Sequence, residues 1–410
     1  MDAHIITIGD EILVGQTVDT NSTHIAKQLN SIGIAVSEIQ SIKDDELHIV
    51  SSLKKAILTN DIIIFTGGLG PTNDDITKNV LTQFFNDELA IHPEVLAKVQ
   101  DFFVRFNKPF LEVNKDQAML PKKAEIIIND LGTASGMWFT QDDKIVISLP
   151  GVPYEMKGLM VKVIAKLTRD FNLGNLYHKT ILLQGKGESY LAEELESWET
   201  EIRAKGITVS YLPSVGMVKI RLTGQLNDKV YILNQLTKVE KQYPLEVFGY
   251  NDDKLERVIG ELLKGRKKTL GTIESCTAGA LSSRIVSVSG SSAYFKGAIV
   301  SYANEIKSNL VDVDSKSITE FGAVSKSVVE QMAVNGLKKL NVDYCISTSG
   351  IAGPEGGSEE KPVGTIWICV ATNDVVHSKM FNFGHSRANN IESTVVYAMN
   401  YLRRVMLNLL

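Results

Sequence analysis

Apolar runs alternate with helical patterns in the first part of the chain. Residues 4–8, 34–39 and 61–65 have the length of strands, and the third run is apolar after its first residue, as in a strand buried on both faces. Between the first two runs, residues 22–30 have helical periodicity, and Gly33 follows. This β-α-β alternation predicts a parallel sheet with helices on both sides.

The pattern changes after about residue 170. Strand-like runs at residues 179–183 and 218–222 flank a Glu-rich helical pattern at 191–198, which predicts a small α+β domain. A helical stretch then leads into a second α/β unit, whose last predicted helix covers residues 391–409. The predicted fold class is α/β, with domains at residues 1–168, 169–251 and 252–410.

Composition and charge exclude several classes of function. A net charge of −5 over 410 residues, without a local Lys/Arg cluster, gives no electrostatic footprint for nucleic acid. No apolar run reaches the roughly 18 residues that a membrane span needs, and the start of the chain is strand-like without a basic leader. The three cysteines, Cys276, Cys345 and Cys369, form no C-x-x-C pair, which favours a reduced, cytoplasmic compartment.

Two stretches of the first domain suggest chemistry, GDEILVGQTVDTNS (9–22) and TGGLGPTNDDIT (66–77). In the second, a buried strand ends in a glycine-rich turn whose amides are suited to cradle a phosphate. Carboxylates follow at Asp74 and Asp75, and a divalent cation would bridge them to a phosphate. The alternative is that the glycines form a tight turn and the acids cap a helix.

Acidic residues also follow the first strand, where Asp10 and Glu11 would face the same edge of a parallel sheet. The candidate metal ligands of the first domain are Asp10, Glu11 and Asp75, and its candidate phosphate cradle is Gly67, Gly68 and Gly70.

The last domain places two nucleophiles side by side, Ser275 and Cys276, between an apolar run and a stretch of small residues typical of a helix start. A serine hydrolase needs a histidine base, yet this domain has only His377 and His385 and no G-x-S-x-G elbow. A lysine that burial keeps neutral can take the serine proton instead. We expect Cys276 to be a buried packing residue. By position alone, Ser275 remains open to the reading of a plain helix cap.

The first domain resembles the molybdopterin-binding domain family, in the version that opens the competence/damage-inducible protein A (CinA) family. The agreement extends to NDLGTASG (129–136), LPGVPYEM (149–156) and NKDQAMLP (114–121). The resemblance places functional aspartates at Asp44 and Asp75. In some CinA-like proteins this domain is similar to a metal-dependent ADP-ribose pyrophosphatase.

One position of the first domain departs from that family, since Ser135 stands where GTAPG has proline. We expect this change to alter a loop and to leave the acids in place. The resulting candidate nucleotide site consists of Gly67, Gly68, Gly70, Asp44, Asp74 and Asp75.

The middle segment resembles the small KH-like domain of the same family. Its GKGE (185–188) is similar to the RNA-clamping GXXG loop but lacks a basic surround. A spacer or dimerisation role is therefore favoured over nucleic-acid binding.

The last domain resembles the CinA C-terminal domain, the nicotinamide mononucleotide (NMN) amidase family. The motifs that carry the resemblance are ESCTAG (274–279), YANEIK (302–307), GAVS (322–325), GIAGPEGG (350–357) and KPVGT (361–365). Ala278 and Ala303 replace a glycine and a serine of these motifs, and we expect both exchanges to matter little. The resemblance assigns catalysis to Ser275, Tyr302 and Lys307.

The expected reaction is hydrolysis of the NMN carboxamide to nicotinate mononucleotide and ammonia. Ser275 would act as nucleophile or activate water, Lys307 with Tyr302 would move the proton, and amides after Ser275 would stabilise the oxyanion. The candidate substrate-binding residues are Thr277, Gly279, Ser291, Ser292, Asn304, Gly350, Gly353 and Arg387. No cofactor is expected for the amidase, whereas the first domain would use a divalent metal ion.

Two other readings stay open. In one, only the N-terminal nucleotide pyrophosphatase is active; in the other, the chain is a non-enzymatic partner in competence or DNA damage. The expected ligands are NMN and ADP-ribose, without nucleic acid or membrane, and the expected assembly is a cytoplasmic homodimer.

Overall fold

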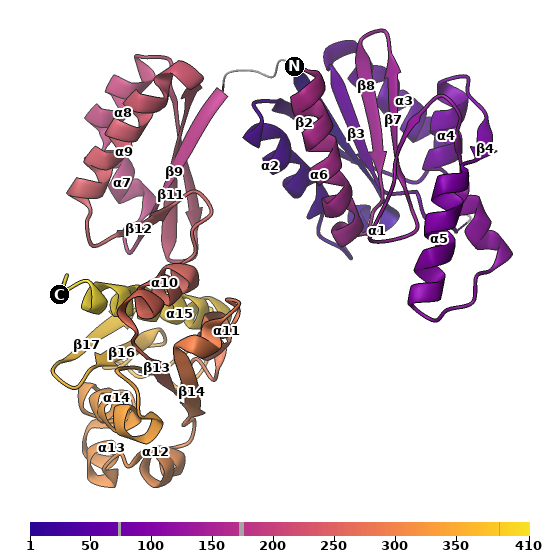
Figure 1. Cartoon of the computed structure of the whole chain (residues 1–410). Coiled ribbons are helices and arrows are strands. Elements are labelled where there is room, and N and C mark those ends of the chain that lie inside the picture. Colours follow the sequence, from indigo (N-terminus) through magenta and orange to yellow (C-terminus); the bar gives the residue numbers. More distant parts are fainter. Residues whose placement is uncertain (73–74, 172–175, 385) are drawn as a thin grey trace. The chain divides into compact units, whose positions relative to one another are not determined.

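A computed structural model describes residues 1–72, 75–171, 176–384 and 386–410. The chain divides into two compact units, Met1–Leu176 and Tyr177–Leu410 (Figure 1). None of the described helices combines the length and the hydropathy that a membrane span requires.

The first unit is built on a six-stranded sheet of order β2-β1-β3-β8-β7-β6. Its strands are β1 (Asp2–Ile8), β2 (Ala35–Ile42), β3 (Ile62–Thr66), β6 (Glu125–Ile127), β7 (Gly136–Gln141) and β8 (Lys144–Leu149). The pairs β1-β2, β1-β3 and β3-β8 are parallel, but β7 pairs antiparallel with both β8 and β6. The expected parallel sheet therefore has an antiparallel extension, and the sheet is mixed.

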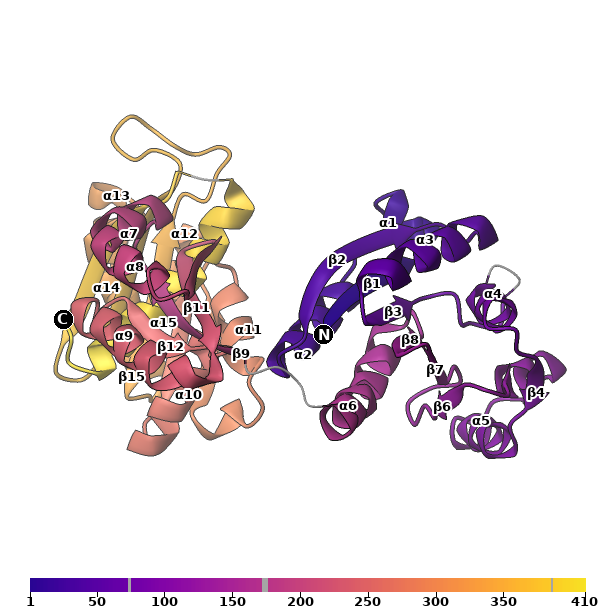
Figure 2. The same cartoon turned by 90° about the horizontal axis from the view of Figure 1, so that it is seen from above.

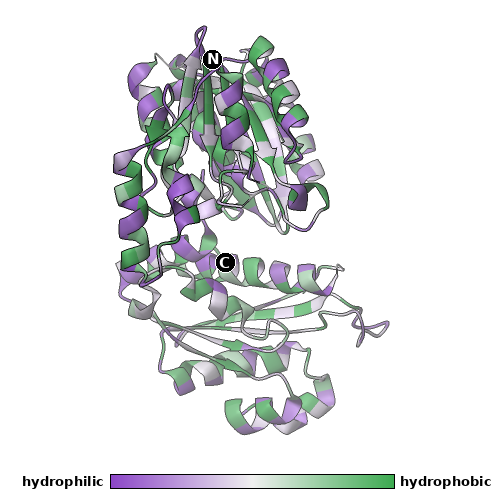
Figure 3. Cartoon of the chain, turned by 90° about the vertical axis from the view of Figure 1, so that its right-hand side faces the viewer, coloured by the Kyte–Doolittle hydropathy of each residue, from purple (hydrophilic) through white to green (hydrophobic). Residues whose placement is uncertain are grey.

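Helices cover both faces of this sheet. They are α1 (Asp10–Leu13), α2 (Asn21–Ser31), α3 (Glu46–Thr59), α4 (Thr77–Phe84), α5 (Pro93–Arg105), η1 (Glu112–Ala118) and α6 (Pro153–Asp170), with a separate hairpin of β4 (Leu89–Ile91) and β5 (Met119–Pro121). Neighbouring residues of β1 enter different cores, Ile5 with α2 and α6, and Ile6 with α3, α4 and α5. Figures 1 and 2 show the sheet between these two helix layers, and the strands are mostly green in Figure 3.

The second unit begins with a four-stranded sheet of order β10-β11-β9-β12. Its elements are β9 (Leu176–Gln184), α7 (Glu188–Glu194), α8 (Glu196–Arg203), β10 (Thr208–Ser214), β11 (Met217–Gln225), η2 (Leu226–Asp228), α9 (Lys229–Gln242) and β12 (Val247–Tyr250). The single helix expected at 191–198 is two helices, which separate at the buried Leu195.

The last part of the chain forms a five-stranded sheet of order β14-β13-β15-β16-β17. Its strands are β13 (Leu270–Glu274), β14 (Phe295–Val300), β15 (Tyr344–Gly350), β16 (Thr365–Ala371) and β17 (Val376–Asn382). β13 pairs in parallel with β14 and β15, so the residues that follow these three strands gather at one edge of the sheet. β16 and β17 extend the sheet antiparallel.

Helices again cover both faces. They are α10 (Leu255–Arg266), α11 (Ala280–Val286), η3 (Ser291–Ala293), α12 (Asn304–Val311), α13 (Ser315–Phe321), α14 (Lys326–Leu340) and α15 (Arg387–Met406). α10, α11 and α15 share one core with the sheet, whereas α14 packs against the opposite face (Figure 1).

The two sheets of the second unit are joined by a common core and by buried hydrogen bonds. Phe248 of β12 belongs to the same apolar cluster as α10 and α15. Asn400 donates to Gln184 at 2.5 Å, and Arg403 donates to the Leu245 carbonyl at 2.7 Å. These contacts explain why residues 177–410 are one compact unit, while the boundary expected near residue 251 stays a prediction.

Candidate active site

Ser275 lies directly after β13, at the sheet edge where parallel strands end. Its amide donates to the Thr348 carbonyl of the neighbouring strand at 3.0 Å, and the residue is 8% exposed. The chain then turns sharply, with Ala278 at φ 49° and Gly279 at φ 98°, before α11 begins at Ala280. The strand and the turn together fix Ser275 at the end of the sheet.

Lys307 of α12 contacts the Ser275 hydroxyl. Its Nζ lies 3.1 Å from Ser275 Oγ and donates to the carbonyls of Ser301 and Tyr302, each at 2.9 Å. The side chain is 1% exposed, and this burial lowers the pKa of Lys307. Within the described parts of the chain no carboxylate, Glu305 included, forms an ion pair with it. The site is thus a buried serine–lysine pair.

Tyr302 meets Lys307 through its backbone and not through its ring. The Tyr302 side chain is 57% exposed, and its hydroxyl accepts a hydrogen bond from Arg387 Nη2 at 3.2 Å. No hydrogen bond between residues of the described structure joins this hydroxyl to Lys307 or Ser275. The structure therefore corrects the expected proton relay through the Tyr302 ring. The Tyr302 hydroxyl binds the Arg387 guanidinium, and only the Tyr302 carbonyl binds Lys307.

A cavity of about 180 Å³ opens at the serine–lysine pair. It is lined by Ser275, Cys276, Tyr302, Asn304, Lys307, Ala323, Val324, Ser349, Gly350, Ala352 and Arg387. The three expected catalytic residues are brought together here, with Asn304, Gly350 and Arg387 from the expected substrate-binding set. Sequence reasoning missed Ser349, although it directly precedes the GIAGPEGG stretch, and it did not single out Ala323 and Val324 within GAVS.

The other expected substrate-binding residues do not line this cavity. Thr277 is buried and its hydroxyl pairs with that of Thr348 at 2.8 Å, while the Gly279 amide donates to Glu274. Ser291 and Ser292 lie in η3, which follows α11 in the chain, and Gly353 contributes its carbonyl to Arg387 at 2.9 Å. The sequence motifs did not show which of these residues reach the cavity, because the course of the helices and loops decides it.

The loop between β15 and β16 is fastened to the cavity wall. Lys361 Nζ donates to the carbonyls of Phe321 and Val324 at 2.7 and 2.9 Å, and Arg387 and Asn390 donate to the carbonyls of Gly353 and Ala352. Lys361 opens the KPVGT stretch, yet sequence reasoning gave it no role.

Cys276 is a poor nucleophile in this setting. It is 5% exposed, and burial raises the pKa of its thiol to about 12. Because the thiolate is the reactive form, the protonated Cys276 thiol beside the serine–lysine pair is a weak nucleophile.

The three glycines of the expected phosphate cradle lie close to other parts of the first unit. A Cβ added at Gly67 would collide with the Ile8 carbonyl, one at Gly68 with the Thr77 hydroxyl, and one at Gly70 with the Asp75 carboxylate. Asp75 also accepts a hydrogen bond from the Thr72 amide at 3.0 Å, which is a turn contact. These contacts favour the tight-turn alternative.

The remaining acids of the expected nucleotide site do not assemble a metal site. Asp44 lies beside Gly68, and Asp74 lies outside the described residues. Glu11 lines a cavity of about 100 Å³ that neither Asp10 nor Asp75 lines. Over residues 1–72, 75–171, 176–384 and 386–410, no group of three or more His, Cys, Asp or Glu is arranged to hold a metal ion. The ligand set Asp10, Glu11 and Asp75 is therefore not formed.

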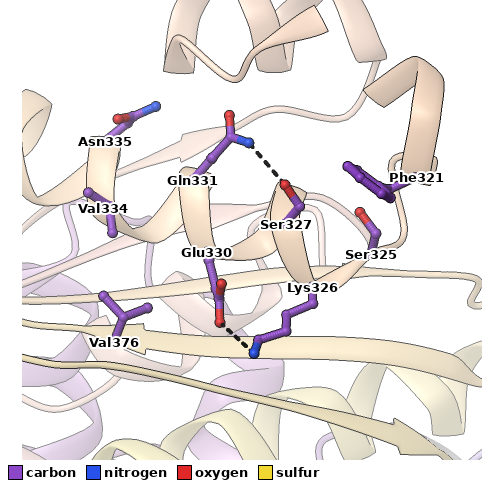
Figure 4. Close-up of a pocket in the computed structure, with 9 residues that line it drawn as sticks. All are labelled: Phe321, Ser325, Lys326, Ser327, Glu330, Gln331, Val334, Asn335 and Val376. Carbon is purple, nitrogen blue, oxygen red and sulfur yellow. Dashed lines mark hydrogen bonds and ion pairs between the residues drawn. The ribbon is translucent and has the colours of Figure 1, made fainter. Parts of the chain in front are cut away.

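A larger groove of about 620 Å³ lies elsewhere in the last domain, along α14 and beside Val376 of β17 (Figure 4). Four of its polar side chains are paired with one another, Lys326 with Glu330 and Gln331 with Ser327. None of the expected catalytic residues lines it.

Comparisons with known proteins identify two parts of the chain. A model described as the CinA C-terminal domain matches residues 252–406, and one described as a probable molybdopterin binding domain matches residues 4–170. A CinA-like protein of Flavobacterium psychrophilum is 45% identical over 99% of both chains, and one of Cytophaga hutchinsonii is 42% identical over 98% of this chain and 97% of its own.

Solved structures similar to part of this chain carry the same family name. The protein CinA from Thermoplasma acidophilum is 34% identical and covers 40% of this chain and 96% of its own, with a TM-score of 0.37. A competence/damage inducible protein from Agrobacterium tumefaciens is 31% identical and covers 37% of this chain and 93% of its own, also at 0.37. The sequence relatives align with essentially the whole chain. The chain therefore belongs to the CinA family, with a molybdopterin-binding-like domain followed by a CinA C-terminal domain.

Proposed function

We propose that the C-terminal domain hydrolyses the carboxamide of NMN to nicotinate mononucleotide and ammonia. The observation that carries this proposal is the contact of Lys307 Nζ with Ser275 Oγ at 3.1 Å, with both residues buried at the cavity. The substrate itself comes from the family resemblance, whereas the chemistry below comes from the geometry.

The hydrogen bonds of Lys307 suit a general base. A neutral amine has two N–H donors and one lone pair, and the carbonyls of Ser301 and Tyr302 accept the two donors. The lone pair then faces Ser275 Oγ and takes its proton as the oxygen attacks the carboxamide carbon. The same proton passes to the departing nitrogen, which leaves as ammonia, and water completes the hydrolysis. Burial favours this neutral state because it lowers the pKa of Lys307.

Backbone amides after Ser275 are the proposed oxyanion donors. The Ala278 amide donates to the Ser275 carbonyl, and the Gly279 and Ala280 amides are also paired within the turn. In the described structure neither the Cys276 amide, which lies against its own thiol, nor the Thr277 amide donates to another residue. Donors fixed in this way stabilise negative charge that develops on the substrate oxygen.

The size of the cavity limits what it encloses. Pockets that bury a whole drug-sized ligand have volumes of about 300–1,000 Å³, so a cavity of about 180 Å³ suits the pyridine carboxamide end of a nucleotide. Arg387 lines the cavity, and two of its nitrogens are engaged by Gly353 and Tyr302. Its remaining donors suit the phosphate group, which guanidinium binds well.

A pyrophosphatase activity of the first unit rests on resemblance alone. Because the described acids form no metal-ligand set, we derive no reaction step there. A homodimer and a cytoplasmic location likewise stay predictions.

Incubation of the purified protein with NMN, followed by assay of ammonia and nicotinate mononucleotide, tests the proposed function. We expect equimolar products, no change on adding EDTA, and loss of at least about a hundredfold in turnover in Ser275→Ala. Absence of ammonia, or near-normal turnover in folded Ser275→Ala, would contradict the proposal.

A further inference from the structure

Glu274, the residue before Ser275, is a fully buried carboxylate that binds the start of the following helix. Its Oε2 accepts hydrogen bonds from the amides of Gly279 at 2.8 Å and Leu281 at 3.2 Å. Its Oε1 accepts from the Ser282 amide at 2.8 Å and lies 3.3 Å from the Thr272 hydroxyl. The side chain thus spans the turn that carries Ser275.

This arrangement satisfies a charge that is otherwise costly to bury. A buried carboxylate needs either a cation or several hydrogen bonds, and the ion pairs of the described residues include none for Glu274. The first amides of a helix lack partners within the helix and carry its positive end, so they bind a carboxylate well. The carboxylate and the start of α11 therefore stabilise each other.

The backbone of Glu274 reaches the other half of the catalytic pair. Its carbonyl accepts from the Ser301 amide at 2.8 Å, and the Ser301 carbonyl accepts from Lys307 Nζ. β13 itself is held by strands on both sides, with Glu274 opposite Val300 and Thr348. One residue on a rigid strand thus connects the serine turn with the segment that holds the lysine.

We propose that Glu274 is a positioning residue, which fixes the Ser275 hydroxyl and the adjacent amides relative to Lys307 without touching the substrate. This inference rests on the role of Ser275 in the proposed function. Misplacement of a reacting group by about 1 Å costs on the order of a hundredfold in rate, so a looser turn lowers turnover.

The first test is Glu274→Gln, which keeps the shape but replaces one acceptor oxygen with a donor that opposes the backbone amides. We expect kcat with NMN to fall at least about thirtyfold and KM to stay within about threefold, because Asn304, Ser349 and Arg387 lie on other segments. The pH at half-maximal rate should not move, since burial is the main cause of the lowered pKa of Lys307 and the Glu274 carboxylate binds the amides of the turn.

The matched control is Glu392→Gln on α15. Glu392 accepts two hydrogen bonds from Arg284 of the same helix α11, at 2.8 and 3.0 Å, but does not contact the serine turn. Its kcat should stay within about threefold of the wild type.

A probe that does not depend on NMN separates this inference from the proposed function. With phenylmethanesulfonyl fluoride, Ser275 Oγ bonds to sulfur, the S–F bond breaks, fluoride leaves and the proton passes to Lys307. Labelling followed by intact mass should be at least about tenfold slower in Glu274→Gln than in the wild type. A wild type that labels but releases no ammonia from NMN contradicts the proposed function alone.

Folding of each variant is checked by circular dichroism. If Glu274→Gln does not fold, Glu274→Asp serves instead, because it keeps the charge but is too short to reach the three amides. Rates of turnover and labelling within threefold of the wild type in the folded variant would overturn the positioning role. So would a loss confined to KM, or a shifted pH profile with a normal maximum.

Discussion

At the scale of single residues, the reactivity of the site depends on which side chains are buried and on the hydrogen-bond partners of each. Lys307 is buried with two carbonyls and one hydroxyl around its nitrogen, and Cys276 is buried beside it with a pKa raised to about 12. Two neighbouring nucleophiles thus have opposite properties, because only the serine faces a base.

Cys276→Ala tests this difference. Because the thiol stays protonated, its removal should leave turnover within about tenfold of the wild type, and thiol reagents should inhibit weakly. Turnover is measured as ammonia release, with Cys345→Ala as a control in the core. Complete loss in a folded Cys276→Ala protein would move the nucleophile to the cysteine.

Ala278 has a conformation that its side chain disfavours. Its φ of 49° lies in the left-handed region, where a residue with a Cβ costs about 1–2 kcal/mol, although the exchange of glycine for alanine was expected to matter little. Ala278→Gly should raise the free energy of unfolding by about 1 kcal/mol in urea titrations. Ala280→Gly, in the adjacent helix, should lower it by about 0.5–1 kcal/mol. Equal changes in the free energy of unfolding for the two substitutions would show that the backbone at Ala278 is not strained.

At the scale of elements, several segments line the cavity, and two of them are the loop after β15 and the segment between α13 and α14. Lys361 joins them, because it lies in the loop before β16 and binds two carbonyls of the segment before α14. The segments that line the cavity through Val324 and Gly350 are therefore held at a fixed spacing.

Lys361→Met should remove the hydrogen bonds that connect these two segments. Loss of hydrogen bonds from a charged donor, worth about 1.5–3 kcal/mol, should raise KM for NMN at least about tenfold with a smaller change in kcat. Lys316→Met, at an exposed position of α13, is the control for removing a lysine. An unchanged KM in Lys361→Met would show that the loops keep their places without this link.

Much of this framework could be predicted from local pattern. The run before Ser275 and the small residues after it indicated a strand and a helix start, and β13 and α11 confirm both. The antiparallel strands β7 and β16 were not predicted, because strand direction depends on connections that periodicity does not report. Ring direction at Tyr302 and the capping role of Glu274 depend on tertiary contacts, so the sequence alone gave no signal for them.

At the scale of the whole molecule, the boundary between the two compact units falls between residues 176 and 177 of the chain, whereas the family model of the last domain starts at residue 252. The segment between them packs on the last domain through Phe248, and its Leu245 carbonyl accepts from Arg403. Burial lowers the pKa of Arg403 to about 10, so this guanidinium depends on its hydrogen bonds.

Fragments that begin at these two points should differ in stability. The fragment 177–410 should match the full chain in amidase kcat, because the cavity lies wholly within it. The fragment 252–410 loses the partner of Arg403 and exposes apolar surface, so it should melt at least about 5 °C lower by calorimetry. Equal melting temperatures would contradict the conclusion that residues 177–251 stabilise the last domain.

The central claim is that neutral Lys307 takes the proton of Ser275, and the pH dependence of kcat for ammonia release from NMN tests it most directly. In the wild type, kcat should rise with pH to a plateau, with an apparent pKa below the ordinary value of 10.5, because the base works only without its proton. Lys307→Arg keeps the charge permanently and should lose at least about a hundredfold in kcat together with the rising limb. Lys326→Arg, at the exposed start of α14, should behave as the wild type. Near-normal turnover in Lys307→Arg, with the rising limb intact, would contradict the serine–lysine mechanism.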